Sequence, residues 1–310
     1  MEYLTTETKN LLFFLQLPTV GIAKLRSIAK TMTEHNSDIQ ILINRALIPK
    51  DSEEYLNAAE AKANRIIELC NKYNIEILSC LDNYYPHLLK KIADYPPLIY
   101  AKGSLTALSN KCAAVVGTRK ASDVGKKISK KISESLANNG FTIVSGLALG
   151  IDTSAHEGTL KANGTTIAIL AHGLDTVTPK SNSILANKIL ENGGTLVSEH
   201  PPEVPAYPPE YAKRNRIQSG MSNFSVIIET GEKGGTIHQA KFTKSQGKEL
   251  YVVIPPNEDV YSCFNASGGQ MIINNMGGIK IGSTIELLNR LSIPSKRVLP
   301  LSTQMDLKGF

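Results

Sequence analysis

Short glycine-containing segments follow three apolar runs of this sequence, and each leads toward a helical stretch. They are Gly117-Thr118-Arg119, the stretch from Ser145 and Gly146 to Asp152, and Gly234-Gly235-Thr236. Glycine lets the backbone turn tightly, and the free N–H groups at the start of a helix attract anions. One such segment is typical of an ordinary turn. Three of them on one edge of a sheet indicate a site that holds phosphate groups.

Cationic side chains accompany these segments. They are Arg119, Lys180 and the Lys213-Arg214-Asn215-Arg216 tetrapeptide. A guanidinium group binds phosphate oxygens in a bidentate manner. In an extended loop Arg214 and Arg216 would share a face, with Asn215 turned away to brace the loop. So many donors exceed the needs of one small phosphate, and they predict a ligand with successive phosphates.

Alternating strands and helices must position these loops. The expected strands are Ala113–Val116, Thr142–Val144, Thr166–Leu170, Thr195–Val197, Ser225–Glu229 and Leu250–Ile254, and the expected helices are Val124–Asn138, Asp152–Ala162, Ser181–Glu191 and Thr236–Gln246. Near-continuous apolar strands separated by helices are typical of a parallel sheet that is buried on both faces. We therefore predict a doubly wound, mostly parallel α/β sheet, whose ligands bind at the carboxyl ends of the strands.

The first part of the chain has helical periodicity instead. We expect a small helical domain at 1–74, the α/β domain at 75–290 and a short tail at 291–310, with no winged-helix domain. The segment LPTVGIAKLRSIA has the form of a helix-hairpin-helix element, which points N–H groups at a DNA phosphate, but two short packed helices have the same pattern. Ile75–Cys80 is an expected strand, and DYPPLIYAKG is an expected connector because of its prolines.

Composition narrows the classes of protein. Lys and Arg number 34 against 28 Asp and Glu, and the net charge of +6 permits an anionic partner without requiring one. The four cysteines form no CxxC pair and no His stands at zinc-ligand spacing, so reduced thiols and no metal are expected. Without a signal peptide or an apolar run of about 18 residues, the sequence predicts a cytoplasmic protein with no membrane contact.

Ordinary nucleotide cofactors fit the sequence poorly. GLALGID differs from GxGxxG, no GxxxxGK[ST] occurs, and Ala171-His172-Gly173 stands where an acidic ribose ligand would follow Leu170. NAD and ATP are therefore disfavoured, and we expect no cofactor.

Six segments in order carry a family resemblance. They are VVGTRKASDVG, TIVSGLALGIDTSAHEGTL, GTTIAILAHGLDTVTPKSNSIL, GGTLVSEHPP, KRNRIQSGMSNFSVIIET and GGTIHQAKFTKSQGKELYVVIPP. Together they closely resemble the DNA-processing protein A (DprA/Smf) family over about residues 75–282. The resemblance implies an extended Rossmann fold and a dimeric, non-enzymatic binder of single-stranded DNA. Such a protein protects incoming DNA and loads the RecA recombinase during natural transformation.

The resemblance also implies roles for individual residues. The phosphate ligands would be Arg119, Lys180, Arg214 and Arg216, and the backbone nests Gly117, Thr118, Ser145, Gly146 and Gly235, with Asn215, Gly234 and Thr236 completing the DNA-binding set. The chain departs from the family at Leu149, where Arg is common, at Ala171-His172, and at Gly234-Gly235-Thr236, where Ser-Gly-Ser is common. The first departure removes a charge, whereas the third keeps the nest and the hydroxyl.

An enzyme is the alternative. Glu229 before Gly234-Gly235-Thr236 is similar to the carboxylate arrangement of the lysine-decarboxylase-like phosphoribohydrolases, which bind or hydrolyse nucleotides, but Gln239 and Ala240 stand where the second carboxylate would be. His156, four residues after Asp152, is interpreted as a helix-start or packing residue. The lysines from Lys126 to Lys131 are interpreted as a solvated face. The candidates for base stacking are Tyr207, Tyr211, Phe224, Tyr261 and Phe264.

Overall fold

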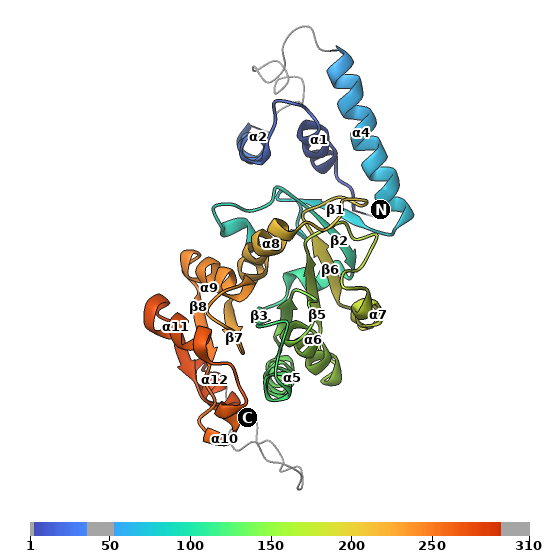
Figure 1. Cartoon of the computed structure of the whole chain (residues 1–310). Helices are drawn as coiled ribbons and strands as arrows, with labels where there is room; N and C mark the ends of the chain where they lie inside the picture. The colour runs from blue at the N-terminus through green and yellow to red at the C-terminus, as the bar shows by residue number, and fades with distance from the viewer. Residues whose placement is uncertain (1–2, 36–52, 293–310) are drawn as a thin grey trace.

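A single nine-stranded sheet organises the molecule (Figure 1). The structure is a computed structural model and describes residues 3–35 and 53–292. The strands are β1 (Glu76–Ser79), β2 (Leu98–Gly103), β3 (Cys112–Val116), β4 (Thr142–Ser145), β5 (Thr166–Leu170), β6 (Thr195–Ser198), β7 (Phe224–Ile227), β8 (Glu249–Val253) and β9 (Ile279–Ile281). From β3 to β7 every strand is buried along its whole length, as the apolar runs predict.

The strand order is β1-β2-β6-β5-β4-β3-β7-β8-β9. The chain starts the parallel part at β3, proceeds outward through β4, β5 and β6, and then returns to the other side of β3 with β7. The order therefore reverses between β3 and β7, which is the topological switch point of the sheet. Connections that run in opposite directions from this point leave a crevice at the carboxyl ends of the two strands.

Helices cover both faces of this sheet (Figure 1). On one face lie α5 (Asp123–Asn138), α6 (Ile151–Lys161) and α7 (Ser183–Glu191), and on the other lie α8 (Pro208–Met221), α9 (Gly235–Ser245) and α11 (Ser267–Met276). The short helices α10 (Glu258–Ser262) and α12 (Thr284–Arg290) belong to the C-terminal part. The predicted fold class, a doubly wound α/β sheet, is confirmed.

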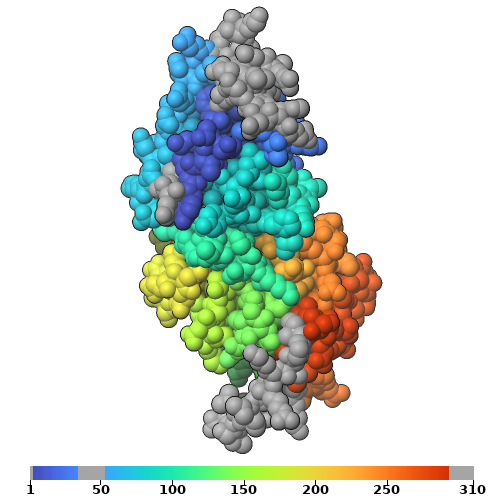
Figure 2. Space-filling model, turned by 180° about the vertical axis from the view of Figure 1, so that it is seen from behind, coloured from blue at the N-terminus to red at the C-terminus, as the bar shows by residue number. Residues whose placement is uncertain are grey.

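The N-terminal helices α1 (Thr6–Leu15) and α4 (Glu53–Lys72) pack on β1 at the edge of the sheet, and α2 (Ile22–His35) packs against α1. Leu11 and Phe14 of α1 belong to the same hydrophobic core as Leu78 of β1 and Ile99 of β2. Asp82 accepts hydrogen bonds from the hydroxyls of Thr5 and Thr8, which fixes the start of α1. In Figure 2 the blue N-terminal helices and the teal segment beside them form one continuous surface.

Two expectations about elements are wrong. Leu98–Gly103, expected to be a connector, is β2, which pairs antiparallel with both β1 and β6. Its prolines, Pro96 and Pro97, precede the strand and so remove no hydrogen bond from the ladder. The tetrapeptide at 213–216, expected to be an extended loop, lies within α8. Most of the expected tail lies outside the described residues.

No helix in residues 3–35 and 53–292 is both long and apolar enough to cross a membrane.

Candidate nucleic-acid interface

A pocket of about 580 Å³ opens at the switch point between β3 and β7. Its walls are the loops that follow these two strands and the first turns of α8 and α9. Of the predicted site residues, it is lined by Gly117, Thr118, Arg119, Arg214, Asn215, Gly234, Gly235 and Thr236. Ser145, Gly146, Lys180 and Arg216 do not line it. Most of the predicted site residues therefore line the pocket that the sheet topology creates.

The start of α9 supplies backbone donors to this pocket. Gly234, the N-cap residue, has a φ of 126°, and no side chain caps the helix. The first N–H groups of a helix have no acceptor within the helix, and the helix dipole adds partial positive charge there. Asn215 Nδ2 donates a hydrogen bond of 2.9 Å to Gly235 O, so α8 braces this loop. This arrangement is suited to bind a phosphate at the N-terminus of α9.

An exposed cation and an aromatic ring lie together in this pocket. The guanidinium carbon of Arg119 is 5.0 Å from the centroid of the Tyr211 ring, and both residues line the pocket. Lys233, which the sequence analysis did not single out, is a further exposed cation of the pocket, directly before the start of α9. Among the candidate aromatic residues, Phe224 and Phe264 are core residues, whereas Tyr211 lines the pocket.

Arg214 forms part of the pocket floor. Its side chain is buried, and Nη1 donates a hydrogen bond to Ile169 O. Burial lowers the pKa of this guanidinium to about 10, although the nearby Asp152 carboxylate opposes the change. The guanidinium lies directly over Gly146, where any Cβ would clash with it. Gly146 therefore makes room for Arg214.

Arg216 points away from the pocket, which corrects the prediction that it shares a face with Arg214. Successive residues of a helix are about 100° apart, so side chains two positions apart lie on nearly opposite sides. Arg216 is buried, and its Nη1 and Nη2 lie 2.9 and 2.6 Å from the two Glu199 oxygens. Its Nε lies 3.2 Å from Asp94 Oδ2. Its charge is thus matched by carboxylates of the chain itself.

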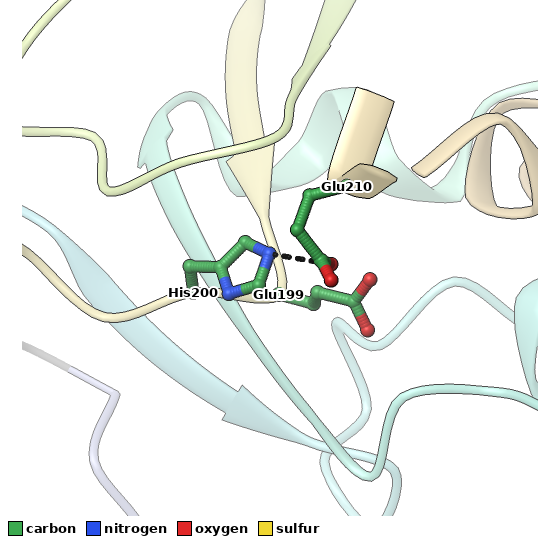
Figure 3. A group of neighbouring side chains, drawn as sticks. All are labelled: Glu199, His200 and Glu210. Carbon is green, nitrogen blue, oxygen red and sulfur yellow. Dashed lines mark ion pairs between the residues drawn. The ribbon is translucent and has the colours of Figure 1, made fainter. Parts of the chain in front are cut away.

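Glu199 belongs to a small polar cluster with His200 and Glu210 (Figure 3). His200 Nε2 lies 3.2 Å from Glu210 Oε2, and their potential ligand atoms, with that of Glu199, lie within 4.8 Å of one another. Arg216 already binds Glu199, and Lys213 lies 3.4 Å from Glu210. Because each carboxylate has a cationic partner, the geometry favours an ion-pair network over a metal site.

The loop after β4 does not present the open amides that its glycines predict. The N–H groups of Gly146 and Ala148 donate to Asp152 Oδ2, at 3.1 and 3.4 Å. Ser145 Oγ donates to Val115 O at 2.7 Å. Burial raises the pKa of Asp152, whereas Arg214 and these amides favour its charged form. The nest is therefore filled by a carboxylate of the protein itself, and Ser145 and Gly146 shape the pocket from behind its floor.

Lys180 is exposed on the same edge of the sheet but beside the pocket. Asn182, two residues later, donates to Leu147 O at 2.8 Å and to Thr153 Oγ1 at 2.9 Å, which fixes the segment against the β4 loop. Leu149, at the tip of that loop, is 48% exposed. This edge of the sheet therefore presents one exposed lysine, Lys180, and one exposed apolar side chain, Leu149.

The lysine stripe of α5 matches its interpretation as a solvated face. Lys126 pairs with Asp123 at 3.1 Å and Lys130 with Glu157 at 2.6 Å, and the lysine side chains are about half exposed (45% and 47%).

The two buried histidines have structural surroundings. His156 Nδ1 lies 2.7 Å from Thr166 Oγ1, and burial lowers the pKa of His156 to about 3. His172 Nδ1 lies 2.8 Å from Gly173 O, and burial lowers its pKa as well. His156 is thus a packing residue, in agreement with the sequence interpretation.

Glu229 is held outside the pocket. Its Oε2 accepts hydrogen bonds from Ser122 N and Oγ at 2.8 and 3.0 Å, and its Oε1 accepts one from Asn265 N at 3.0 Å. The carboxylate, which is buried, ties the start of α5 to the segment before α11. A group with all these donors is poorly placed to act on a sugar.

The fold and this pocket define a Rossmann-like protein with a crevice at its switch point that is lined by backbone amides and cations. A sequence profile described as DNA recombination-mediator protein A matches residues 76–289. The chain belongs to this family, known as DprA or Smf, which confirms the resemblance.

Named relatives agree with this assignment. Protein Smf of Escherichia coli is 34% identical over 71% of this chain and 59% of its own length. DNA processing protein DprA of Bacillus subtilis is 32% identical over 74% and 76%, respectively. The chain thus spans less than two thirds of the E. coli relative.

Solved structures show the same fold. DNA processing protein A of Streptococcus pneumoniae superposes with a TM-score of 0.75 at 26% identity, covering 91% of this chain and 97% of the other. The protein from Helicobacter pylori, described for its single-stranded DNA binding mode, has a TM-score of 0.62 at 24% identity, with 71% and 96% covered.

Proposed function

We propose that the pocket at the switch point binds the sugar-phosphate backbone of single-stranded DNA. The observation that carries this proposal is the meeting of the uncapped α9 N-terminus with Arg119, Lys233 and the Tyr211 ring in one open pocket. Backbone amides and cations bind phosphates, and an aromatic face stacks on a base of any sequence. The pocket is open rather than enclosed, as a continuous strand requires.

Family membership supports a role in recombination. Relatives in B. subtilis and S. pneumoniae are named DNA processing proteins, and the H. pylori protein binds single-stranded DNA. We infer that this chain protects incoming single strands, delivers them to a RecA-type recombinase and works as a homodimer.

A nucleotide-hydrolysing enzyme is the rival function, and the geometry gives it less support. Its one candidate carboxylate, Glu229, is fully engaged outside the pocket. Asp152, an acidic residue that does line the pocket, accepts hydrogen bonds from two amides of the β4 loop. We therefore propose binding without catalysis.

Oligonucleotide binding tests the proposal. The protein is expected to bind single-stranded DNA more tightly than duplex of equal length. With about three to five phosphate contacts, log K should fall against log salt with a slope of roughly −2 to −3.5. Tighter binding to duplex, or salt-independent binding, contradicts the proposal, and release of free base from nucleoside monophosphates would favour the enzyme.

A further inference from the structure

A second cavity lies between α2 and the segment from β1 to β2. Its volume is about 490 Å³, which is within the range of small-ligand sites. Arg26 and Lys30 line it from α2, and Leu81, Lys90 and Tyr95 line it from the other side. We call this cavity the α2 groove. It is separate from the pocket at the switch point, since the two share no lining residue.

The described residues that line the α2 groove carry positive charge. Three of these residues are cationic and none of them is acidic. Arg26 is fixed by carbonyl oxygens, because its Nε donates to Tyr95 O at 2.9 Å and its Nη1 to Ala93 O at 3.3 Å. Within residues 3–35 and 53–292, neither Arg26 nor the exposed Lys90 forms an ion pair. The charges of Arg26 and Lys90 therefore remain available to an anionic ligand.

The floor of the α2 groove suits a flat organic group beside the anion. The guanidinium carbon of Arg26 lies 5.6 Å from the centroid of the Tyr95 ring. Leu81 adds apolar surface, and Tyr95 is half-buried. Guanidinium planes and aromatic rings both stack on nucleobases. A nucleotide unit therefore meets both requirements, a phosphate for the cations and a base for the floor.

Helix α8 connects the α2 groove with the first pocket. Arg26 holds the Ala93–Tyr95 segment from the α2 side, and Arg216 of α8 holds it through Asp94. Arg214, two residues earlier on α8, lines the first pocket. The two cavities thus flank the same helix.

We propose that a single DNA strand bound in the first pocket continues past α8 into the α2 groove. This inference rests on the proposed function and adds a second binding segment to it. A strand long enough to reach both cavities makes more phosphate contacts than a short one. The contacts in the α2 groove must then appear only with long strands.

Charge reversal in the α2 groove tests the inference. The experiment compares wild type with the variant Lys90→Glu, using fluorescence anisotropy and labelled oligo-dT of about 5 and about 20 nucleotides. Lys188→Glu is the control, because Lys188 is an exposed lysine on α7. Lys90→Glu is expected to bind the long strand about 3-fold more weakly, with a salt slope shallower by about 0.7 for one lost phosphate contact. Its affinity for the short strand should stay unchanged, which also shows that the variant is folded.

The outcomes separate this inference from the proposed function. Unchanged affinity of Lys90→Glu for the long strand overturns the inference about the α2 groove and leaves the proposal for the first pocket intact. Equal losses for both strand lengths, or an equal loss in Lys188→Glu, overturn it as well. If wild type binds neither strand, the proposed function fails together with the inference.

Discussion

The guanidinium of Arg214 covers the α-carbon of Gly146, so that a side chain at 146 and the observed position of Arg214 exclude each other. The two residues come from different connections, one after β4 and one in α8. Asp152 completes the contact by accepting the Gly146 N–H and facing the Arg214 charge. The floor of the pocket is therefore a packed unit built around a buried cation.

Gly146→Ala should displace Arg214 and distort this floor. The methyl group meets both Nη atoms, so the buried guanidinium must move away from its hydrogen bond to Ile169 O. We expect a loss of about 1–3 kcal/mol in the free energy of unfolding and weaker binding of single-stranded DNA, measured by urea denaturation and anisotropy. Gly21→Ala is the control, because a Cβ at Gly21 would meet no atom within 4 Å. Gly140→Ala is unsuitable, because the φ of Gly140 is 81°, which strains any other residue. Equal stability of Gly146→Ala and wild type would contradict this packing.

Tyr211 should contribute through its ring rather than its hydroxyl. Removing a stacking ring costs about 1–3 kcal/mol of binding free energy per base, so Tyr211→Ala should weaken binding by that amount while Tyr211→Phe stays near wild type. Tyr55→Ala is the matched control, because Tyr55 is 56% exposed on α4. Anisotropy titrations with oligo-dT measure all three. Equal affinities of Tyr211→Ala and wild type would remove the ring from the interface.

Glu229→Gln should affect stability and leave the pocket chemistry unchanged. The amide would place its own NH₂ donors against the donors of Ser122 or Asn265. An unfavourable buried contact of this kind costs about 1–3 kcal/mol, to be measured by urea denaturation. DNA affinity of the folded variant should match wild type. If wild type releases base from nucleoside monophosphates and Glu229→Gln does not, the enzyme is the better account.

His156 should contribute to the loss of stability of the fold at acidic pH. The folded protein holds its pKa at about 3 against an ordinary value of 6.5. Below about pH 6.5 the unfolded chain therefore binds a proton that the folded chain excludes, so stability falls as the pH decreases toward 3. In His156→Gln this contribution is absent, and the difference in unfolding free energy between about pH 7.5 and pH 5 should shrink. An identical pH dependence in the two proteins would contradict the buried neutral imidazole.

The sequence predicted the strands better than the helix that carries the arginines. Strands β3 to β8 are nearly continuous apolar runs, so their burial can be predicted from the sequence. In α8 the residues from Arg214 to Met221 are all buried although several are polar, because both sides of the helix make contacts. When a helix is buried without an apolar stripe, its sequence has no helical period of apolar residues that would show which side chains share a face. This is why the direction of Arg216 was predicted incorrectly.

The glycine loops show a second limit. A glycine-containing turn before a helix predicts open amides, and the start of α9 agrees. In the β4 loop the same pattern is satisfied by Asp152, only six residues from Gly146. Sequence alone does not tell whether a carboxylate at the start of a helix caps its own loop or leaves the amides to a ligand. Tyr211 and Lys233 are far from Arg119 in the sequence, and only the crossover at the switch point places the three residues in one pocket.

The most direct test of the central claim is the affinity of Arg119→Ala for single-stranded oligo-dT across a salt series. Arg119 is exposed and its guanidinium lies over Tyr211 in the pocket, so the variant should fold normally. We predict binding weaker by about 5- to 10-fold for all sequences alike and a salt slope shallower by about 0.7. The control is Arg65→Ala, since Arg65 is an exposed arginine of α4 that pairs with Glu203 at 3.7 Å. Unchanged affinity and slope in Arg119→Ala, or an equal loss in Arg65→Ala, would contradict a phosphate site at the switch point.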